Sequence, residues 1–172
     1  WKSLPLDTRH FKSLELRLLS LFENLDEELD GRLIKSENYQ ALNTLKDKFK
    51  GRVKCSYIDP PYNTSTETLP YSDNFRHASW MSMIQDRIAA ARDLMGPKGV
   101  MYSSIDANER RGLECAMENV VGSDNRVEEI IWVQNTTKSQ SPTYSNNHEY
   151  VEVYTRNLDA VKKDERMFRE PK

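Results

Sequence analysis

The chain has 172 residues, of which 37% are hydrophobic and 30% charged, and its formal net charge at pH 7 is −2. This length is enough for one domain with a substantial hydrophobic core. The charge balance excludes an overall basic field for nucleic acid, so any such surface has to be local or lie outside these residues. No apolar run reaches the length of a membrane span, and two distant cysteines without a CxxC spacing predict a reduced, cytoplasmic protein.

The first fifty or so residues predict two helices with a short strand between them. Asp7 can cap a helix whose apolar side chains recur with the 3.6-residue period; these are Phe11, Leu14, Leu18, Leu21, Phe22 and Leu25. Residues 32–35 are a candidate strand, and the apolar spacing over 39–49 predicts a second helix that Gly51 closes. We expect residues 1–30 to form an N-terminal helical segment.

Strands and helices alternate from residue 53 onward. Residues 53–58 predict a strand, and a helix begins near Ser79 with its apolar side chains on one face. The Gly-Pro-Lys-Gly run over 96–99 ends this helix, and residues 100–105 predict the next strand.

A helix and two more strands follow. Asp106 and Glu109 have the D-x-x-E spacing of a capping box, which accounts for both residues at the start of this helix, and their loop should lie near the same sheet edge as Asp59. Strands are predicted over 127–133 and 149–154, with a long polar loop, 135–147, between them. The pattern predicts an open, mostly parallel α/β sheet with an antiparallel strand pair near the C-terminus.

The sequence Asp59-Pro60-Pro61-Tyr62 follows the strand over 53–58 directly. In open α/β sheets, ligands bind beyond the carboxyl ends of the strands, where Asp59 is expected. Pro60 and Pro61 have no backbone N–H, so the turn presents only acceptors, the Asp59 carboxylate and the Pro60 carbonyl, in fixed directions. The ring of Tyr62 adds a flat face for stacking. Together these groups suit a planar aromatic amine.

The amino group of a nucleobase is such a substrate. Its nitrogen lone pair is delocalised into the ring, which makes the nitrogen a poor nucleophile. Accepting hydrogen bonds from both N–H bonds localises the lone pair, and the nitrogen can then attack an electrophilic methyl carbon. A base inside duplex DNA has to be flipped out first, and stacking on an aromatic side chain holds it there.

The residues Asp59 to Tyr62 resemble the DPPY motif of amino-methylating DNA methyltransferases, which use S-adenosylmethionine. The run GRLIKSENYQALNTLKDKFKGRVKCSYIDPPYNT is similar to the approach to the catalytic strand in type III restriction-modification methyltransferase subunits. The stretches YSDNFRHASWMSMIQDRI, SSIDANE, EEIIWVQN and HEYVEVYTRN resemble later segments of that group, in the same order. The resemblance covers residues 4 to about 157.

This resemblance implies a Rossmann-like, S-adenosylmethionine-dependent methyltransferase fold of the permuted β class. It implies that Asp59 to Tyr62 are the catalytic and base-binding residues. Ser36-Glu37-Asn38 matches a stretch that is commonly Gly-Asp-Asn in the family and lies near the cofactor. Glu37 and Asn38 are therefore implied as cofactor contacts, although two of the three positions differ. The implied partners are DNA, a restriction subunit and a second copy of the protein.

The implied reaction is methylation of the N6 amino group of adenine in DNA, within a restriction-modification system. Cytosine-N4 methylation is the alternative in chemistry, because both groups are exocyclic amines. Within the family, Asp at the first position of the motif favours adenine, whereas Ser is more frequent for cytosine. A rival of another class is a non-catalytic methyltransferase-like subunit that binds DNA or a partner, and the intact DPPY motif disfavours it.

The glycines of the chain depart from the family pattern. The family's cofactor loop is an FxGxG stretch downstream of a target-recognition region, whereas none of the six glycines here has a GxG spacing. We therefore expect residues 31–160 to be the catalytic-motif half of a methyltransferase domain and residues 161–172 to begin a further region. The cofactor loop and the target-recognition region are expected outside this chain.

Two other residue types, tryptophan and histidine, have structural interpretations. Trp80 is expected to pack in the core rather than to stack on a base. His148 begins a predicted strand and is expected to be structural. Because His10, His77 and His148 are far apart in the sequence, no metal site is predicted.

Overall fold

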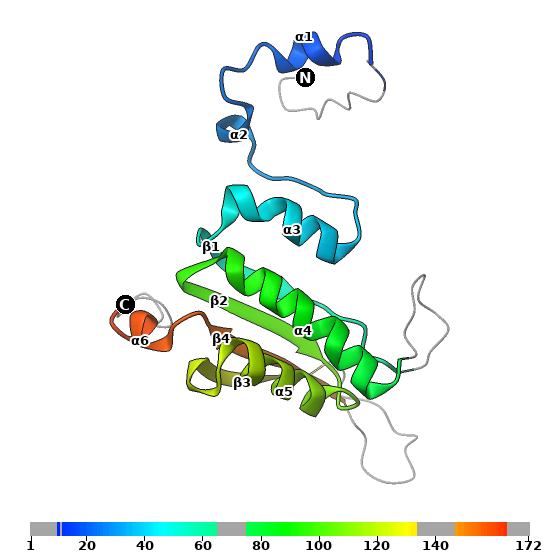
Figure 1. Cartoon of the computed structure of the whole chain (residues 1–172), viewed down its shortest axis with the longest axis vertical. Coiled ribbons are helices and arrows are strands. Elements are labelled where there is room, and N and C mark those ends of the chain that lie inside the picture. The colour runs from blue at the N-terminus through cyan, green and yellow to red at the C-terminus, as the bar shows by residue number, and fades with distance from the viewer. Residues whose placement is uncertain (1–9, 11, 65–74, 134–146, 165–172) are drawn as a thin grey trace. The chain divides into compact units, whose positions relative to one another are not determined.

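The computed structural model describes residue 10 and residues 12–64, 75–133 and 147–164. The chain forms two compact units, residues 1–35 and residues 36–172 (Figure 1). None of the helices in the described ranges combines the length and the hydropathy that a membrane span requires.

The first unit contains two short helices, α1 (Glu15–Leu19) and α2 (Leu25–Glu28), where the apolar spacing predicted one longer helix. Neither helix contains a buried residue, and Leu16 is 81% exposed. A helix in a protein is stabilised mainly by packing of its apolar face. The apolar side chains of this segment recur with the helical period but are not buried, so they do not stabilise one long helix. The expected cap Asp7 and the apolar position Phe11 lie outside the described residues.

The prediction of a strand over residues 32–35 is wrong. These residues have no regular secondary structure, and their side chains are exposed. A strand needs a neighbouring strand to pair with its backbone N–H and C=O groups. No described strand pairs with residues 32–35.

The second unit is built on a sheet whose described strands have the order β1-β2-β4-β3. The strands β1 (Val53–Ile58) and β2 (Met95–Ile105) are parallel. The strand β4 (His148–Thr155) is antiparallel to both β2 and β3 (Arg126–Val133). The predicted α/β class and the antiparallel pair near the C-terminus are confirmed, and the described strands together form a mixed sheet.

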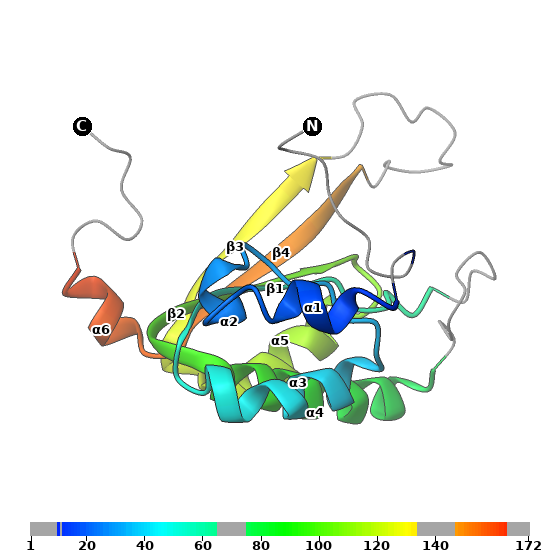
Figure 2. The ribbon, with the colours of Figure 1, turned by 90° about the horizontal axis from the view of Figure 1, so that it is seen from above.

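Three helices cover one face of this sheet: α3 (Asn38–Phe49), α4 (His77–Leu94) and α5 (Arg110–Val121) (Figure 2). Side chains alternate between the two faces of a strand, so Met101 and Ile105 of β2 point toward the helices. The buried apolar residues form one core between sheet and helices, and its largest members are Trp80, Ile84, Ile88, Met95, Met101, Ile105, Leu113, Met117 and Tyr154.

The strand β2 begins at Met95, directly after α4, and not at Val100 as predicted. A Cβ atom on Gly99 would lie 2.8 Å from the Val53 carbonyl oxygen, and one on Gly96 would lie 3.1 Å from the Gly51 carbonyl oxygen. Because glycine has no Cβ, the start of β2 can lie against the start of β1. The glycines end the helix, as predicted, and they also begin the strand.

The ends of the elements follow local sequence signals. Gly51 closes α3 in the left-handed region, with a φ of +69°, as predicted. A one-turn 3-10 helix, η2 (Ser123–Asn125), precedes β3. The helix α6 (Leu158–Lys162) follows β4 and was not predicted, although Asn157 accepts a hydrogen bond from the Ala160 N–H at 2.9 Å as its N-cap.

Candidate active site

The parallel pairing of β1 and β2 brings the loops that follow both strands to the same edge of the sheet. Ile58 pairs with Ser103, so Asp59, directly after β1, lies beside Ser104 of β2. The Asp59-to-Tyr62 turn and the loop that carries Asp106 to Glu109 are therefore neighbours, as expected. This is the edge at which open α/β sheets bind ligands.

The Asp59 carboxylate is oriented by a serine of the adjacent strand. The Ser104 hydroxyl donates a hydrogen bond to Oδ1 of Asp59 at 2.7 Å and lies 3.5 Å from the Ile58 carbonyl oxygen. Asp59 is exposed to solvent, whereas Pro60 behind it is buried. The carboxylate is therefore held from one side and open on the other.

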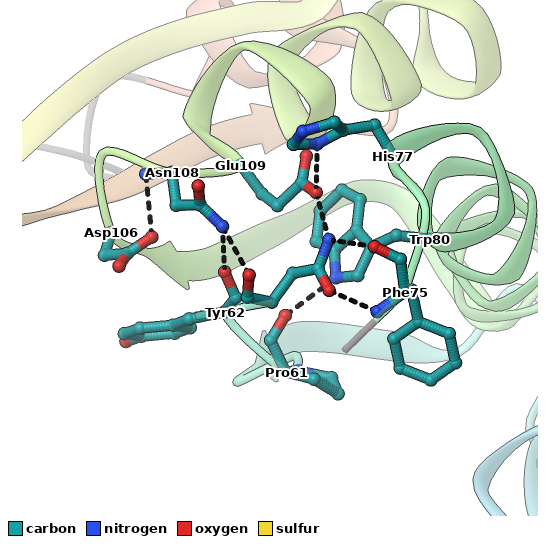
Figure 3. Close-up of polar contacts among 9 residues, drawn as sticks. Pro61, Tyr62, Phe75, His77, Trp80, Asp106, Asn108 and Glu109 are labelled. Atoms are coloured by element: carbon teal, nitrogen blue, oxygen red, sulfur yellow. Dashed lines mark hydrogen bonds and ion pairs between the residues drawn. The ribbon is translucent and has the colours of Figure 1, made fainter. Parts of the chain in front are cut away.

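The three backbone carbonyls after Pro60, those of Pro61, Tyr62 and Asn63, accept hydrogen bonds from side chains of other elements. The Trp80 indole N–H donates to the Pro61 carbonyl at 2.7 Å (Figure 3). The Asn108 amide donates to the Tyr62 carbonyl at 3.2 Å and to the Asn63 carbonyl at 2.5 Å. The backbone after Pro60 is thus fixed by donors from α4 and from the loop before α5.

Two acceptors of the turn remain available to a ligand. Among the described residues, no donor is hydrogen-bonded to Oδ2 of Asp59 or to the Pro60 carbonyl. Pro60 and Pro61 have no backbone N–H, so neither can donate to these acceptors. These are the two acceptors that the sequence predicted for an amino group.

The Tyr62 side chain is half-buried and is tied at its hydroxyl. The hydroxyl donates to Oε2 of Glu149, on β4, at 3.2 Å. Burial raises the pKa of Tyr62 well above its usual range, the nearby Ser104 hydroxyl opposes this shift, and the carboxylates of Asp59 and Glu149 add to it. The hydroxyl therefore stays neutral and remains a donor.

A cavity of about 450 Å³ lies beside the turn. Its wall brings together five of the six residues predicted for the site, Glu37, Asn38, Asp59, Pro60 and Pro61, and the structure does not place Tyr62 on the wall. Half of the remaining lining residues come from α4, namely Met83, Ile84, Arg87 and Ile88. The others are Phe75, Ile58, Ser36 and Ser103, and the set is largely apolar.

Glu37 has a local role as well as a place on the cavity wall. Its Oε2 accepts a hydrogen bond from the Gln40 N–H at 3.1 Å and so caps α3, and its Oε1 lies 2.5 Å from a guanidinium nitrogen of Arg87. The backbone N–H of Tyr39 and the Arg87 guanidinium lower the pKa of the Glu37 carboxyl. The capping bond places the start of α3 at the cavity.

The predicted capping box of Asp106 and Glu109 is wrong. Oδ1 of Asp106 accepts from the Asn108 N–H at 2.9 Å, and α5 starts after Glu109 without a side-chain cap. Oε1 of Glu109 instead lies 2.5 Å from Nδ2 of Asn63 and 2.6 Å from Nδ1 of His77. Tertiary hydrogen bonds to the turn replace the local pair that the spacing suggested.

The sequence did not identify the residues that hold the turn: Asn63, Ser104, Asn108 and Glu149. Only Asn63 had a local signal, because it follows the motif directly and asparagine tolerates the left-handed backbone region. Trp80 is fully buried, so its predicted packing role is confirmed, and its hydrogen bond to Pro61 is an addition.

The contacts of His148 agree with its expected structural role. A ring nitrogen of His148 lies 2.9 Å from the Tyr150 hydroxyl, and the two rings meet edge to face. Within the described ranges, no group of three or more His, Cys, Asp or Glu side chains could hold a metal ion.

Comparison with known proteins gives Mod subunits of type III restriction-modification enzymes and type II methyltransferases. The chain is 31% identical over 134 residues to the HindVI Mod subunit of Haemophilus influenzae, and the match covers 75% of this chain and 18% of that protein. It is 29% identical over 159 residues to the Mod subunit of the type III restriction-modification enzyme EcoP15I of Escherichia coli, covering 75% of this chain and 24% of that protein. The chain thus spans about a quarter or less of the length of these relatives.

Solved structures match the fold at low sequence identity. M1.HpyAVI in complex with S-adenosylmethionine has a TM-score of 0.50 at 16% identity, over 73% of this chain and 54% of that one. A DNA modification methylase from Thermus thermophilus, TTHA0409, has a TM-score of 0.52 at 13% identity, over 80% of this chain and 55% of that one. The Rossmann-like methyltransferase fold is therefore shared.

The family assignment comes from a match along most of the chain. Residues 53–172 match the model of the N6/N4 DNA methylase family, beginning with β1 and including the Asp59-to-Tyr62 turn. The match contains β1 to β4, α4 and α5, the elements that build the sheet edge with the candidate site. The chain therefore belongs to the DNA methylase family.

Proposed function

We propose that this chain carries the catalytic turn of a DNA methyltransferase that transfers a methyl group from S-adenosylmethionine to the N6 amino group of adenine. The observation that carries the proposal is the Asp59-to-Pro61 backbone, which lines the cavity and leaves Oδ2 of Asp59 and the Pro60 carbonyl available as acceptors. The family assignment and the similarity to Mod subunits support it.

The two acceptors suit the nitrogen of a flipped adenine. Each can accept one N–H of the amino group, which draws the nitrogen toward tetrahedral geometry and localises its lone pair. Because Ser104 and the fixed backbone hold both acceptors in place, little reorganisation is needed when the nitrogen becomes charged. Tyr62 offers its ring for stacking with the base. The proton that leaves the nitrogen can pass to the exposed side of Asp59.

The cavity suits a cofactor of the expected size. Its volume lies within the range of about 300–1,000 Å³ that is usual for small-molecule sites, and its wall is mostly apolar with a few charged groups. We propose that Asn38 and Glu37 contribute to cofactor binding from the start of α3, with Arg87 holding Glu37 in place. When bound, S-adenosylmethionine supplies an electrophilic methyl carbon.

The Mod relatives suggest the biological setting. Their names place them in type III restriction-modification enzymes, and we propose the same setting for this protein, with DNA as substrate and a restriction subunit as partner. A second copy of the protein is proposed as a further partner, and a cytoplasmic location follows from the substrate. Size-exclusion chromatography with light scattering, with and without the restriction subunit, tests both assemblies.

The proposed reaction is tested by product analysis. The protein in its natural length is incubated with DNA and S-adenosylmethionine that carries a labelled methyl group, and the DNA is digested to nucleosides for mass spectrometry. N6-methyl-2′-deoxyadenosine is expected. N4-methylcytosine would replace the proposed base by cytosine, and unlabelled DNA despite measurable cofactor binding would favour a non-catalytic subunit.

A further inference from the structure

Asn63, the residue after the catalytic turn, ties that turn to the start of α4. Asn63 has a φ of +58°, the only positive φ among the described non-glycine residues. It is buried, with 7% of its surface exposed. Its Oδ1 accepts the Phe75 N–H at 2.6 Å, and its Nδ2 donates to the Phe75 carbonyl at 3.0 Å. This pairing works only if the amide of Asn63 faces one way, with its oxygen toward the Phe75 N–H.

Glu109 fixes that orientation. Its side chain is 3% exposed, and its Oε1 lies 2.5 Å from Nδ2 of Asn63 and 2.6 Å from Nδ1 of His77, whose side chain is 74% exposed (Figure 3). An ionised carboxylate only accepts hydrogen bonds, so it requires the NH₂ end of the Asn63 amide. A buried carboxylate is costly without hydrogen-bond partners, which makes this contact a strong constraint.

Gly112 leaves space beside the Glu109 carboxylate, which contacts Asn63. A Cβ atom on Gly112, one turn along α5, would lie 2.8 Å from Oε2 of Glu109. Position 112 is inside a helix, where alanine is about 1 kcal/mol more favourable than glycine. An alanine at this position would displace the Glu109 carboxylate, which is the end of a flexible side chain and can move without disrupting the helix.

We propose that Glu109 is a positioning residue for methyl transfer, acting through Asn63 on the backbone of the Asp59-to-Tyr62 turn. Its side chain leaves α5 without a side-chain cap and contacts the turn instead. The role rests on the proposed function, because the turn it holds is the one that receives the amino group. Glu109 does not contact the target base in this proposal. It fixes the positions of the two acceptors, Oδ2 of Asp59 and the Pro60 carbonyl, and of the Tyr62 ring.

The first test compares Glu109→Ala with Glu109→Gln in the protein in its natural length. Glutamine keeps an oxygen that accepts from Asn63, so Glu109→Gln retains most of the single-turnover methylation rate. Glu109→Ala lowers that rate by about 100-fold, because displacements of about 1 Å at a reacting centre have effects of this size. Glu118→Ala, at an exposed position of the same helix, is the matched control and keeps the parent rate.

The second test uses Gly112→Ala, which displaces the carboxylate without removing it. We expect Gly112→Ala alone to lower the methylation rate, and to lower it little further when Glu109 is already alanine, because the clash is gone. Such non-additivity is the signature of two residues acting through one contact. Additive effects of the two substitutions would overturn the proposal, even if Glu109→Ala by itself folds poorly.

A third readout does not depend on activity. The Phe75 amide proton is hydrogen-bonded to Asn63, and its exchange with solvent can be followed by NMR. Exchange should be faster in Glu109→Ala and close to the parent in Glu109→Gln. Unchanged exchange in Glu109→Ala, or an equal loss of rate in both variants, would overturn the role of Glu109. A parent protein that methylates no DNA would contradict the proposed function instead, and the exchange experiment would still report on the contact.

Discussion

The hydroxyl of Ser104 donates a hydrogen bond to Oδ1 of Asp59 across the parallel pair β1 and β2, over 2.7 Å. The two residues are 45 positions apart in the sequence. Their contact selects one rotamer of the Asp59 side chain and leaves Oδ2 on the open side. Asp59 is therefore pre-oriented by the sheet itself, since the donor belongs to a strand and not to a loop.

Ser104→Ala should slow methyl transfer without unfolding the protein. A hydrogen bond to a charged acceptor contributes about 1.5–3 kcal/mol when buried, and the exposure of Asp59 reduces this, so we expect a rate about 3–10-fold lower. Single-turnover methylation of DNA at saturating cofactor measures it. Ser82→Ala, at an exposed position of α4, is the control. A parent-like rate in Ser104→Ala would show that Asp59 needs no orientation by Ser104.

Asp59→Ala should have a much larger effect. It removes the proposed acceptor of the amino group, and one well-placed electrostatic contact of this kind is typically worth about 10²–10³ in rate. The thermal unfolding temperature should change little, because Asp59 is exposed. Single-turnover kinetics together with circular dichroism separate the two effects. Near-normal methylation by folded Asp59→Ala would show that Asp59 is not needed for methyl transfer.

Substitutions of Tyr62 distinguish stacking from hydrogen bonding. Tyr62→Ala should lose about 1–3 kcal/mol of stacking with the base, whereas Tyr62→Phe keeps the ring and should retain much of the activity. A fluorescent base analogue at the target position of the DNA reports the stacking. Glu149→Gln should resemble Tyr62→Phe, because both change the hydrogen bond that ties the ring to β4. Equal damage from Phe and Ala at position 62 would assign the main role to the hydroxyl.

The buried Glu152 of β4 makes stability depend on pH. Burial raises the pKa of this carboxyl to about 7, and the neighbouring Glu129 carboxyl acts in the same direction. Its Oε2 lies 3.2 Å from a guanidinium nitrogen of Arg126, while Oε1 has no hydrogen-bond partner among the described residues. Between the ordinary value of 4.5 and about 7, the native protein therefore keeps a proton that the unfolded chain has lost.

Stability should fall as the pH rises through this window. The contribution of Glu152 is fully present below pH 4.5 and is lost by the time the pH has passed about 7, with a slope of at most about 1.4 kcal/mol per pH unit. Glu152→Gln should flatten this part of the profile in urea unfolding, whereas Glu118→Gln, at an exposed position, should not. Glu129 has a lowered pKa, so its own titration falls below the window. Identical profiles for parent and Glu152→Gln would contradict the prediction.

The sequence by itself determined the class of fold and the position of the Asp59-to-Tyr62 turn. The β1 strand over residues 53–58 was predicted with the bounds that the structure has, and Asp59 lies at its carboxyl end. These features depend on neighbouring residues: an apolar run that suits a strand, and two prolines that end it because they lack N–H groups. The helix α3 and its end at Gly51 were predictable for the same reason.

Local patterns were misleading where a segment had no partner or had a distant one. The apolar spacing before residue 25 predicted one long helix, but no described side chain of α1 or α2 is buried. Residues 32–35 look like a strand and pair with no described strand. Asp106 and Glu109 have the spacing of a capping box, yet Glu109 bonds with Asn63, 46 positions earlier in the chain.

Only the tertiary structure decided how the site is held together. Glu37 and Asp59 are far apart in the sequence but line one cavity, because α3 packs on α4 and both helices lie on the same face of the sheet. The donors that bind the turn, Ser104, Asn108 and Trp80, come from other elements and have no spacing relation to the motif. A sequence pattern reflects interactions over a few residues, whereas these partners are set by which strands are adjacent and which helix faces the sheet.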